Sequence, residues 1–303
     1  MEFYWLDAVE DYKNKSRIHL FGKVRHPGQS DKQKKIDYFS GNLQIKNMKR
    51  NIFVFKKEDS TASLEEMQEE IEGRIKFKHS YIYNKMKMKP CKKYYAFEMN
   101  VQHGEVECIK ISYSFDFPTL DIPFEGKTYK GIFGTTYTPI EMFMLKRKIM
   151  GPCWLKVQNV EEVRDRESYC SYEFFVDTYK DMIVHEDAKK PAPPLKALFV
   201  SMEMIQPPAG SANKKSQIAT IAGLFCERYN IEYSDACTYQ PSLFVQAKNI
   251  DKSAQQTLVQ NFGESINIVD KEYGILTSFI QKLNKLDPDL IIGHDLNQVF
   301  MDN

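Results

Sequence analysis

The sequence predicts an α+β protein in which a mixed α/β domain is followed by a second domain, a mixed sheet with helices packed on it. Three observations predict this class. Short runs rich in β-branched and aromatic residues, typical of strands, recur along the chain. A few longer segments repeat apolar residues at helical spacing. Prolines cluster at 191–194, so we expect a linker at 189–194 between domains at 1–188 and 195–303.

The composition is that of a globular protein with a sizeable core. The chain has 303 residues, of which 42% are hydrophobic and 27% charged, and its formal net charge is +1. A charge near zero means that any nucleic-acid contact must come from a local patch. No apolar run reaches the roughly 18 residues that span a bilayer, and residues 1–5 lack the pattern of a secretory signal. The six cysteines form no C-x-x-C pair, which predicts reduced, buried thiols without structural zinc.

The first domain begins with strands and then alternates with helices. Residues 18–24, 39–45 and 51–55 are predicted strands. A helix follows at Ser63, because Ser63 and Glu66 have the spacing of a capping box. Its predicted buried stripe is Leu64, Met67, Ile71 and Ile75.

A second helix is predicted to begin at Thr138, with Pro139 in its first turn and Glu141 three residues after the cap. Its predicted stripe is Met142, Leu145 and Ile149.

The second domain contains four predicted strands, a helix and a last apolar strand. The strands are residues 195–204, 218–225, 242–247 and 265–269, with a loop at 206–216. A helix before Asp287-Pro288 should bury Leu276, Phe279, Ile280, Leu283 and Leu286. Residues 290–293 form a fully apolar run, which predicts a buried strand. This order is that of the early half of a ribonuclease H-like fold.

Four stretches carry a resemblance to a known family. They are FYWLDA with LFGKV at 3–8 and 20–24, GPCWL at 151–155, PPLKALFVSME at 193–203, and DPDLIIGH at 287–294. In order and spacing they resemble the amino-terminal and exonuclease-like domains of family B replicative DNA polymerases, most nearly the alpha branch, represented by the catalytic subunit of DNA polymerase alpha.

The resemblance implies a nuclear DNA-directed DNA polymerase, a nucleotidyltransferase of DNA replication that extends RNA primers. The implied partners are the DNA template, the RNA/DNA primer, primase and accessory subunits. Mg²⁺ is expected for the parent polymerase, and no cofactor for this part of it. The polymerase motifs Asp-x-x-Ser-Leu-Tyr-Pro-Ser and Tyr-Gly-Asp-Thr-Asp do not occur in the sequence. We therefore expect an amino-terminal fragment that has no catalytic residues of its own.

The positions that match the nuclease motifs of proofreading relatives are incomplete. Such relatives carry Asp-x-Glu on one strand face, where two carboxylates share a two-metal site. Here the triplet is Ser201-Met202-Glu203. The second motif aligns with the run from Asp295 to Phe300, so that Phe300 takes the place of the metal-binding aspartate; a slip of two residues would offer Asp302 instead.

Two residues of this domain, Glu203 and His294, are of types that take part in catalysis or metal binding. A lone carboxylate is a poor divalent site, so a leftover surface carboxylate is favoured for Glu203. His294 has no nucleophile beside it in sequence, which favours a structural histidine.

The most basic stretch is the candidate nucleic-acid contact. Its residues are Lys85, Lys87, Lys89, Lys92, Lys93 and Tyr94. Extended, it would present Lys85, Lys87 and Lys89 on one face, where lysines could hold phosphates and a tyrosine could stack on a base. The competing interpretation, which is favoured, is an edge strand that uses lysines against aggregation. The runs 214–215 and 146–148 are weaker candidates.

Three functions from different classes remain open at this stage. The first is a polymerase scaffold that borders the template path without proofreading activity. The second is an active metal-dependent 3′–5′ exonuclease, and the carboxylate count argues against it. The third is a module that binds partner subunits and no DNA. Salt-dependent DNA binding separates the first from the third.

Overall fold

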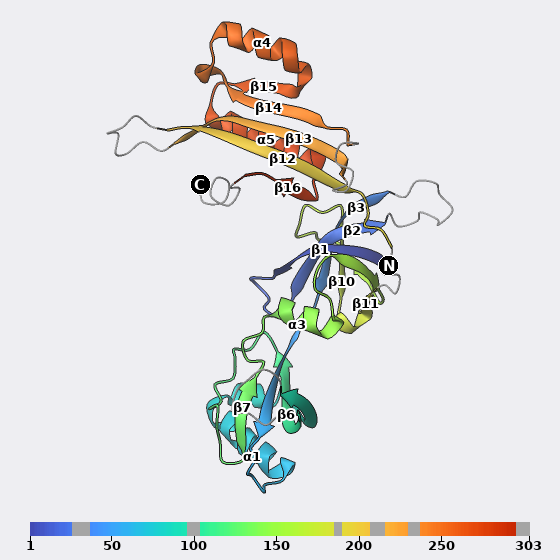
Figure 1. The fold of residues 1–303 in the computed structure, drawn as a ribbon, viewed down its shortest axis with the longest axis vertical. Helices are drawn as coiled ribbons and strands as arrows, with labels where there is room; N and C mark the ends of the chain where they lie inside the picture. The colour runs from blue at the N-terminus through green and yellow to red at the C-terminus, as the bar shows by residue number, and fades with distance from the viewer. Residues whose placement is uncertain (26–36, 96–103, 185–189, 207–215, 230–236, 295–303) are drawn as a thin grey trace. The chain divides into compact units, whose positions relative to one another are not determined.

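The computed structural model describes residues 1–25, 37–95, 104–184, 190–206, 216–229 and 237–294. The chain divides into two compact units, Met1–Lys190 and Pro191–Asn303 (Figure 1). The mixture of strands and helices in both units confirms the predicted α+β class. No helix among the described residues combines the length and the apolar character that crossing a bilayer requires.

The first unit begins with a seven-stranded sheet in the order β11-β8-β1-β2-β3-β10-β9. Its core includes Phe3, Leu20 and Leu43, which are fully buried. Gly22 is required in β2, because a Cβ there would overlap the carbonyl oxygen of Tyr4 on the neighbouring strand. The strands are β1 (Glu2–Glu10), β2 (Ile18–Arg25), β3 (Tyr38–Ile45), β8 (Cys153–Val157), β9 (Glu161–Glu162), β10 (Tyr172–Val176) and β11 (Met182–Val184).

A second, four-stranded sheet in the same unit has the order β5-β6-β4-β7. Its elements are β4 (Lys49–Lys56), α1 (Leu64–Lys78), α2 (Ser80–Tyr83), β5 (Lys87–Tyr95), β6 (Gly104–Ser114) and β7 (Tyr129–Phe133). Helix α1 covers one face, where Met67, Ile71 and Ile75 pack against Ile52 and Ile109. The predicted capping box is confirmed, because Ser63 and Glu66 bond each other's backbone N–H groups.

Helix α3 (Pro139–Arg147) begins at the predicted cap, with reciprocal bonds between Thr138 and Glu141. Its predicted stripe is wrong at one position. Leu145 is 55% exposed, whereas Phe143 is fully buried beside Met142. The helix packs through the flank that faces both β1 and β4, and Leu145 projects away from it.

The second unit contains a five-stranded sheet in the order β15-β14-β13-β12-β16. The three central strands are antiparallel, and β16 and β15 each run parallel to their neighbours. This is the expected ribonuclease H-like arrangement. The elements are β12 (Leu195–Ile205), β13 (Gln217–Tyr229), β14 (Gln240–Gln246), α4 (Lys252–Phe262), β15 (Ile266–Val269), α5 (Glu272–Leu286) and β16 (Leu290–Ile292). Short 3-10 turns lie at Tyr179–Asp181, Ala247–Asn249 and Gly263–Ser265.

Two burial predictions in this unit are wrong. On α5 the buried residues are Ile275 and Phe279, while Leu276 is 37% and Ile280 51% exposed. The α5 face that meets the sheet is therefore rotated by about one residue from the predicted stripe. Strand β16 is not fully buried, since Ile291 is 50% exposed. It lies at the edge of the sheet, where only one side has a neighbouring strand among the described residues.

The six cysteines, all within the described residues, are thiols. Only Cys108 and Cys226 are buried, so the expectation of burial is wrong for the other four. The predicted loop at 206–216 falls almost entirely outside the described residues.

Candidate nucleic-acid interface and nuclease-like strand

Strand β12 carries the two nuclease-motif positions that the structure describes. Ser201 and Glu203 are both exposed on one face, and Met202 between them packs toward the core under α5. Their partners on β13 are Ala222 and Thr220. The predicted positions therefore share one exposed strand face, which carries a hydroxyl at 201 and a carboxylate at 203.

One carboxylate from β12 is a weak basis for metal chemistry. Two-metal nucleases hold both ions with several anionic oxygens, and a serine hydroxyl supplies no charge. The second-motif positions Asp295 and Phe300, together with the alternative Asp302, lie outside the described residues. His294 is exposed just after β16.

Strand β5 separates the predicted basic residues onto two faces. Lys89 and Lys93 pair with Lys110 and Val106 of β6 and point away from α1. Lys92, exposed like Lys93, points to the opposite face.

Of the remaining members of the predicted set, Lys87 shares the face of Lys89, and Lys85 and Tyr94 do not. Lys87 is exposed at the start of β5, on the same face as Lys89. Lys85 precedes the strand and lies over the ring of Phe117, with its Nζ 5.2 Å from the ring centre. Tyr94 is 74% exposed on the face that Lys92 occupies.

Two lysines that the basic stretch does not contain approach Lys89 and Lys93. Burial, and then the ammonium groups of Lys146 and Lys89, lower the pKa of Lys110. Burial, and then Lys93 and Arg147, lower the pKa of Lys146. Lys146 comes from α3 and belongs to the weaker run 146–148. The lysines 89, 93, 110 and 146 thus form one basic cluster.

The sequence contained a usable signal for Lys110, which we did not predict. Residues 109–113 alternate apolar and polar side chains, as a half-buried strand does. A strand beside β5 would have placed Lys110 next to the basic stretch. No local pattern indicates that α3 brings Lys146 to the same place.

A carboxylate braces the edge of this sheet. Glu70 on α1 accepts hydrogen bonds from the N–H groups of Lys127 and Thr128, from the Thr128 hydroxyl and from Arg74. Although burial opposes ionisation, these bonds lower the pKa of Glu70 to about 2. The contact fixes the residues that lead into β7.

Two thiols lie close together on the same sheet. The Sγ atoms of Cys91 and Cys108 are 3.3 Å apart on paired residues of β5 and β6. Burial, together with the neighbouring Cys91 thiol, raises the pKa of Cys108 to about 12. Cys108 therefore stays protonated at neutral pH and is a poor nucleophile.

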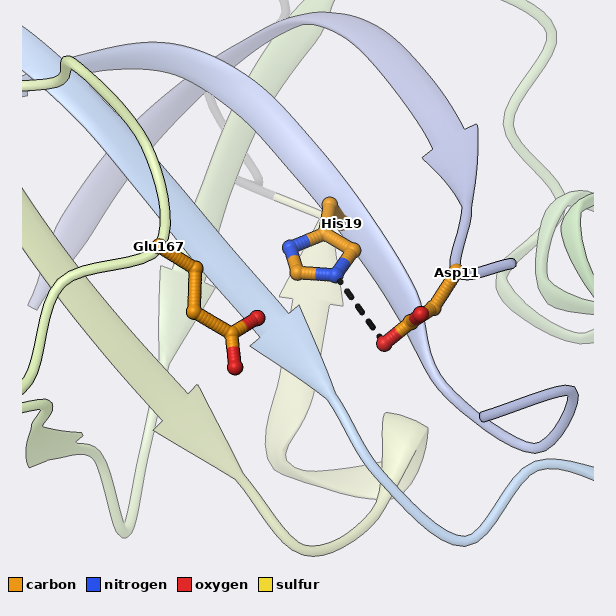
Figure 2. Close-up of side chains that lie close together, drawn as sticks. All are labelled: Asp11, His19 and Glu167. Atoms are coloured by element: carbon orange, nitrogen blue, oxygen red, sulfur yellow. Dashed lines mark ion pairs between the residues drawn. The ribbon is translucent and has the colours of Figure 1, made fainter. Parts of the chain in front are cut away.

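Figure 2 shows the one His, Asp and Glu cluster with metal-like spacing among the described residues. Ligand atoms of Asp11, His19 and Glu167 lie within 4.8 Å of one another. However, the Arg17 guanidinium bonds Asp11 and lies 3.0 Å from the Glu167 carboxylate. Since that cation already neutralises part of the acidic charge, we interpret the cluster as an ion-pair network that joins the β1–β2 turn to the segment before β10.

Asp11 is the most strongly perturbed member of the network. Burial favours its protonated form, but the N–H group of Lys13, the Arg17 guanidinium and the N–H group of Asn14 outweigh it and lower the pKa to about 2.

Comparison with known proteins relates the chain to one family of DNA polymerases. A profile described as DNA polymerase family B, exonuclease domain, matches residues 130–302. The DNA polymerase alpha catalytic subunit of Sterkiella nova is 29% identical over 98% of this chain and 20% of its own length. That of Xenopus laevis is 29% identical over 97% of this chain, and that of Mus musculus 28% identical over 97%. The chain spans about a fifth of these relatives.

A solved structure extends the likeness to the fold. The family B DNA polymerase from the hyperthermophilic archaeon Pyrobaculum calidifontis superposes with a TM-score of 0.58 over 99% of this chain and 31% of that one. The sequence identity is 12%, so this comparison bears on the fold alone.

Proposed function

The chain belongs to family B of the DNA polymerases, and from this we propose that it is the amino-terminal and exonuclease-like part of an alpha-type replicative polymerase. In this proposal residues 1–188 form the amino-terminal domain, 189–194 a linker and 195–303 the exonuclease-like domain. The part shapes the enzyme and borders the nucleic acid, while nucleotide transfer occurs elsewhere in the parent. It has neither polymerase nor proofreading activity of its own.

One observation carries the absence of proofreading. On β12, the alignment implied by the resemblance puts Ser201 in the place of the first metal-binding carboxylate, on the same exposed strand face as Glu203. A neutral hydroxyl cannot hold Mg²⁺ against water as a carboxylate does. Without two ions, the attacking and leaving oxygens are not both stabilised.

The experiment measures release of nucleotides from the 3′ end of labelled single-stranded DNA, with Mg²⁺ or Mn²⁺. We expect no release by the 303-residue chain and no extension of a primed template. Glu203→Gln is the matched control, because contaminating nuclease is insensitive to it. Metal-dependent release that Glu203→Gln abolishes would establish the rival function, an active exonuclease.

The remaining functional properties follow from the relatives, which are named DNA polymerase alpha catalytic subunits. We infer that the parent uses Mg²⁺, extends RNA primers on a DNA template and acts with primase and accessory subunits in the nucleus. Reconstitution of the full-length protein with primase tests this, since de novo synthesis should require both components. An extension assay with and without Mg²⁺ tests the metal requirement.

A further inference from the structure

We propose that the face of the β5-β6-β4-β7 sheet opposite α1 binds single-stranded nucleic acid, with lysines holding the phosphates and phenyl rings stacking on the bases. We call it the lysine–phenylalanine face; its residues are Phe53, Lys89, Lys93, Lys110, Phe133 and Lys146. It rests on the proposed function in so far as that function places nucleic acid beside this part of the enzyme. Beyond that function, the proposal specifies the binding surface, the residues that form it and a single-stranded ligand.

One row of side chains crosses all four strands of this face. Lys89 pairs with Lys110, Lys110 with Phe53, and Phe53 with Phe133. Paired residues on adjacent strands point to the same side of a sheet, about 4.8 Å apart. The opposite side is occupied by Ile52 and other residues that pack under α1. The row therefore presents two ammonium groups followed by two phenyl rings on one surface.

The placement of the lysines on this face destabilises the sheet. Like charges directly opposite each other on paired strands destabilise a sheet, and Lys89 and Lys110 have this relation. Lys93 and Lys146 add two more ammonium groups to the same cluster. In the part of the chain that the structure describes, none of the four has a carboxylate within ion-pair distance. An arriving phosphate backbone would supply the missing anions.

Protection of a sheet edge does not explain this arrangement. Strand β5 is an edge strand, so its lysines alone could serve to prevent aggregation. Strand β6 lies inside the sheet between β5 and β4, where there is no edge to protect. Lys110 nevertheless projects from it. Lys146 lies on helix α3, which is not part of this sheet, and it approaches Lys110.

Aromatic rings lie next to the cations. The Nζ of Lys93 lies over the ring of Phe53, 5.1 Å from the ring centre, and Phe53 is half-buried against a cluster that includes Phe55 and Cys108. Phe133 contacts Phe124, which is 55% exposed, at a ring-centre distance of 6.3 Å. A base stacked on an aromatic ring gains affinity without sequence preference, because every base has a π-face.

The connection of the strands provides a suitable platform. The chain order β4-α1-β5-β6-β7 with the spatial order β5-β6-β4-β7 places α1 on one face and leaves the central strands β4 and β6 side by side. Four-stranded sheets of this kind bind two or three unpaired nucleotides in RNA-recognition domains. A duplex keeps its bases stacked on one another, so the rings would have nothing to stack on. The ligand class is therefore a single strand, as DNA or RNA.

The test measures fluorescence anisotropy of labelled oligo(dT) and oligo(rU) titrated with the 303-residue chain over a range of salt concentrations. Neutralising about three or four phosphates predicts a slope of about −2 to −3 in log affinity against log salt. Lys89→Gln combined with Lys110→Gln should reduce that slope by about 1.4. Phe53→Leu should weaken binding about 5- to 150-fold, and Phe53→Tyr should preserve it.

Matched variants control for general effects. Lys76→Gln removes a charge from the exposed side of α1, and Phe77→Leu removes an aromatic ring that is 89% exposed on the same helix. Both should bind as the wild type does. Circular dichroism verifies that each variant is folded, and the lysine variants keep the test valid if Phe53→Leu destabilises the sheet.

Each outcome decides the proposal. Loss of affinity confined to the variants of the lysine–phenylalanine face supports it, and the oligo(dT) and oligo(rU) arms show which strand is preferred. Unchanged binding in these variants overturns it but leaves the proposed function intact, because another surface would then border the nucleic acid. Equal affinity for heparin, with no effect of Phe53→Leu, overturns base stacking. Absence of any binding also overturns it, while the nucleotide-release assay judges the proposed function separately.

Discussion

Replacement of Glu70 by Gln should destabilise the four-stranded sheet, because one carboxylate holds the approach to β7. One oxygen accepts the Lys127 N–H and the Arg74 guanidinium, each at 2.9 Å. The other accepts the Thr128 N–H at 2.9 Å and the Thr128 hydroxyl at 2.7 Å. Glutamine keeps the shape but offers one accepting oxygen, and its NH₂ group would meet donors at the other position.

The magnitude follows from the pKa of Glu70. The hydrogen bonds lower it from 4.5 to about 2. At 1.36 kcal/mol per pKa unit, the ionised carboxylate contributes about 3 kcal/mol to the free energy of unfolding at pH 7. The side chain is 15% exposed, so solvent screening reduces this little. Because the folded pKa is depressed, the contribution is complete above the unfolded value and disappears as pH falls toward 2.

The assay is hydrogen exchange of the α1 amides, which reports the local free energy of opening in a chain with two units. We expect Glu70→Gln to lower that free energy by about 2–3 kcal/mol at pH 7. At pH 3 the difference from wild type should shrink to about 1.4 kcal/mol. Glu69→Gln, an exposed neighbour on the same helix, should change it by less than about 0.5 kcal/mol.

Two results would refute this reasoning. If Glu70→Gln changed protection by no more than Glu69→Gln, the four hydrogen bonds would have no net value. If its effect were the same at pH 3 as at pH 7, charge would not be the cause. The loss would then come from altered packing between α1 and β7.

Three other substitutions test separate parts of the molecule. Asp11→Asn should lower the free energy of unfolding by about 2 kcal/mol at neutral pH, because the pKa of Asp11 is lowered from 3.8 to about 2. Urea titrations at several pH values should show this difference disappear as pH falls from about 4 toward 2. Lys110→Gln should raise the thermal midpoint, since it relieves the repulsion from Lys89, worth about 0.2–1 kcal/mol; a lowered midpoint would contradict the strained pairing. Ser201→Asp in the full-length polymerase should not restore release of 3′ nucleotides with Mg²⁺ or Mn²⁺, although it rebuilds the pair with Glu203; clear release would mean that another acid completes the site.

The features that could be predicted from the sequence are those set by nearby residues. Both capping boxes depend on two side chains three residues apart, and both form as predicted. The shared face of Ser201 and Glu203 follows from the period of two along a strand. Helix α4 was missed because its few apolar residues are interrupted by polar ones, and none of its residues is buried.

Other features depend on contacts between distant segments and could not be predicted locally. Helix α5 has apolar residues on more than one side, and only the position of the sheet selects Ile275 over Leu276. The apolar run of β16 resembles a central strand, yet Ile291 is half exposed at a sheet edge. The approach of Lys146 to Lys110 requires α3 to meet the four-stranded sheet, which no pattern within α3 encodes.

The charges at the candidate positions differ between the two sheets. Negative charge is low on β12 and positive charge is concentrated on the four-stranded sheet, and each feature favours contact with a polyanion. Two carboxylates on one strand face attract metal ions and, without them, repel phosphate. On β12 a neutral Ser201 lies on the same strand face as Glu203, so these two positions carry one carboxylate. On the four-stranded sheet, positive charge accumulates around Lys110 at a cost to pairing between β5 and β6. Like charges on paired strands lower the stability of a sheet, and this is the basis on which we propose an anionic ligand for this face.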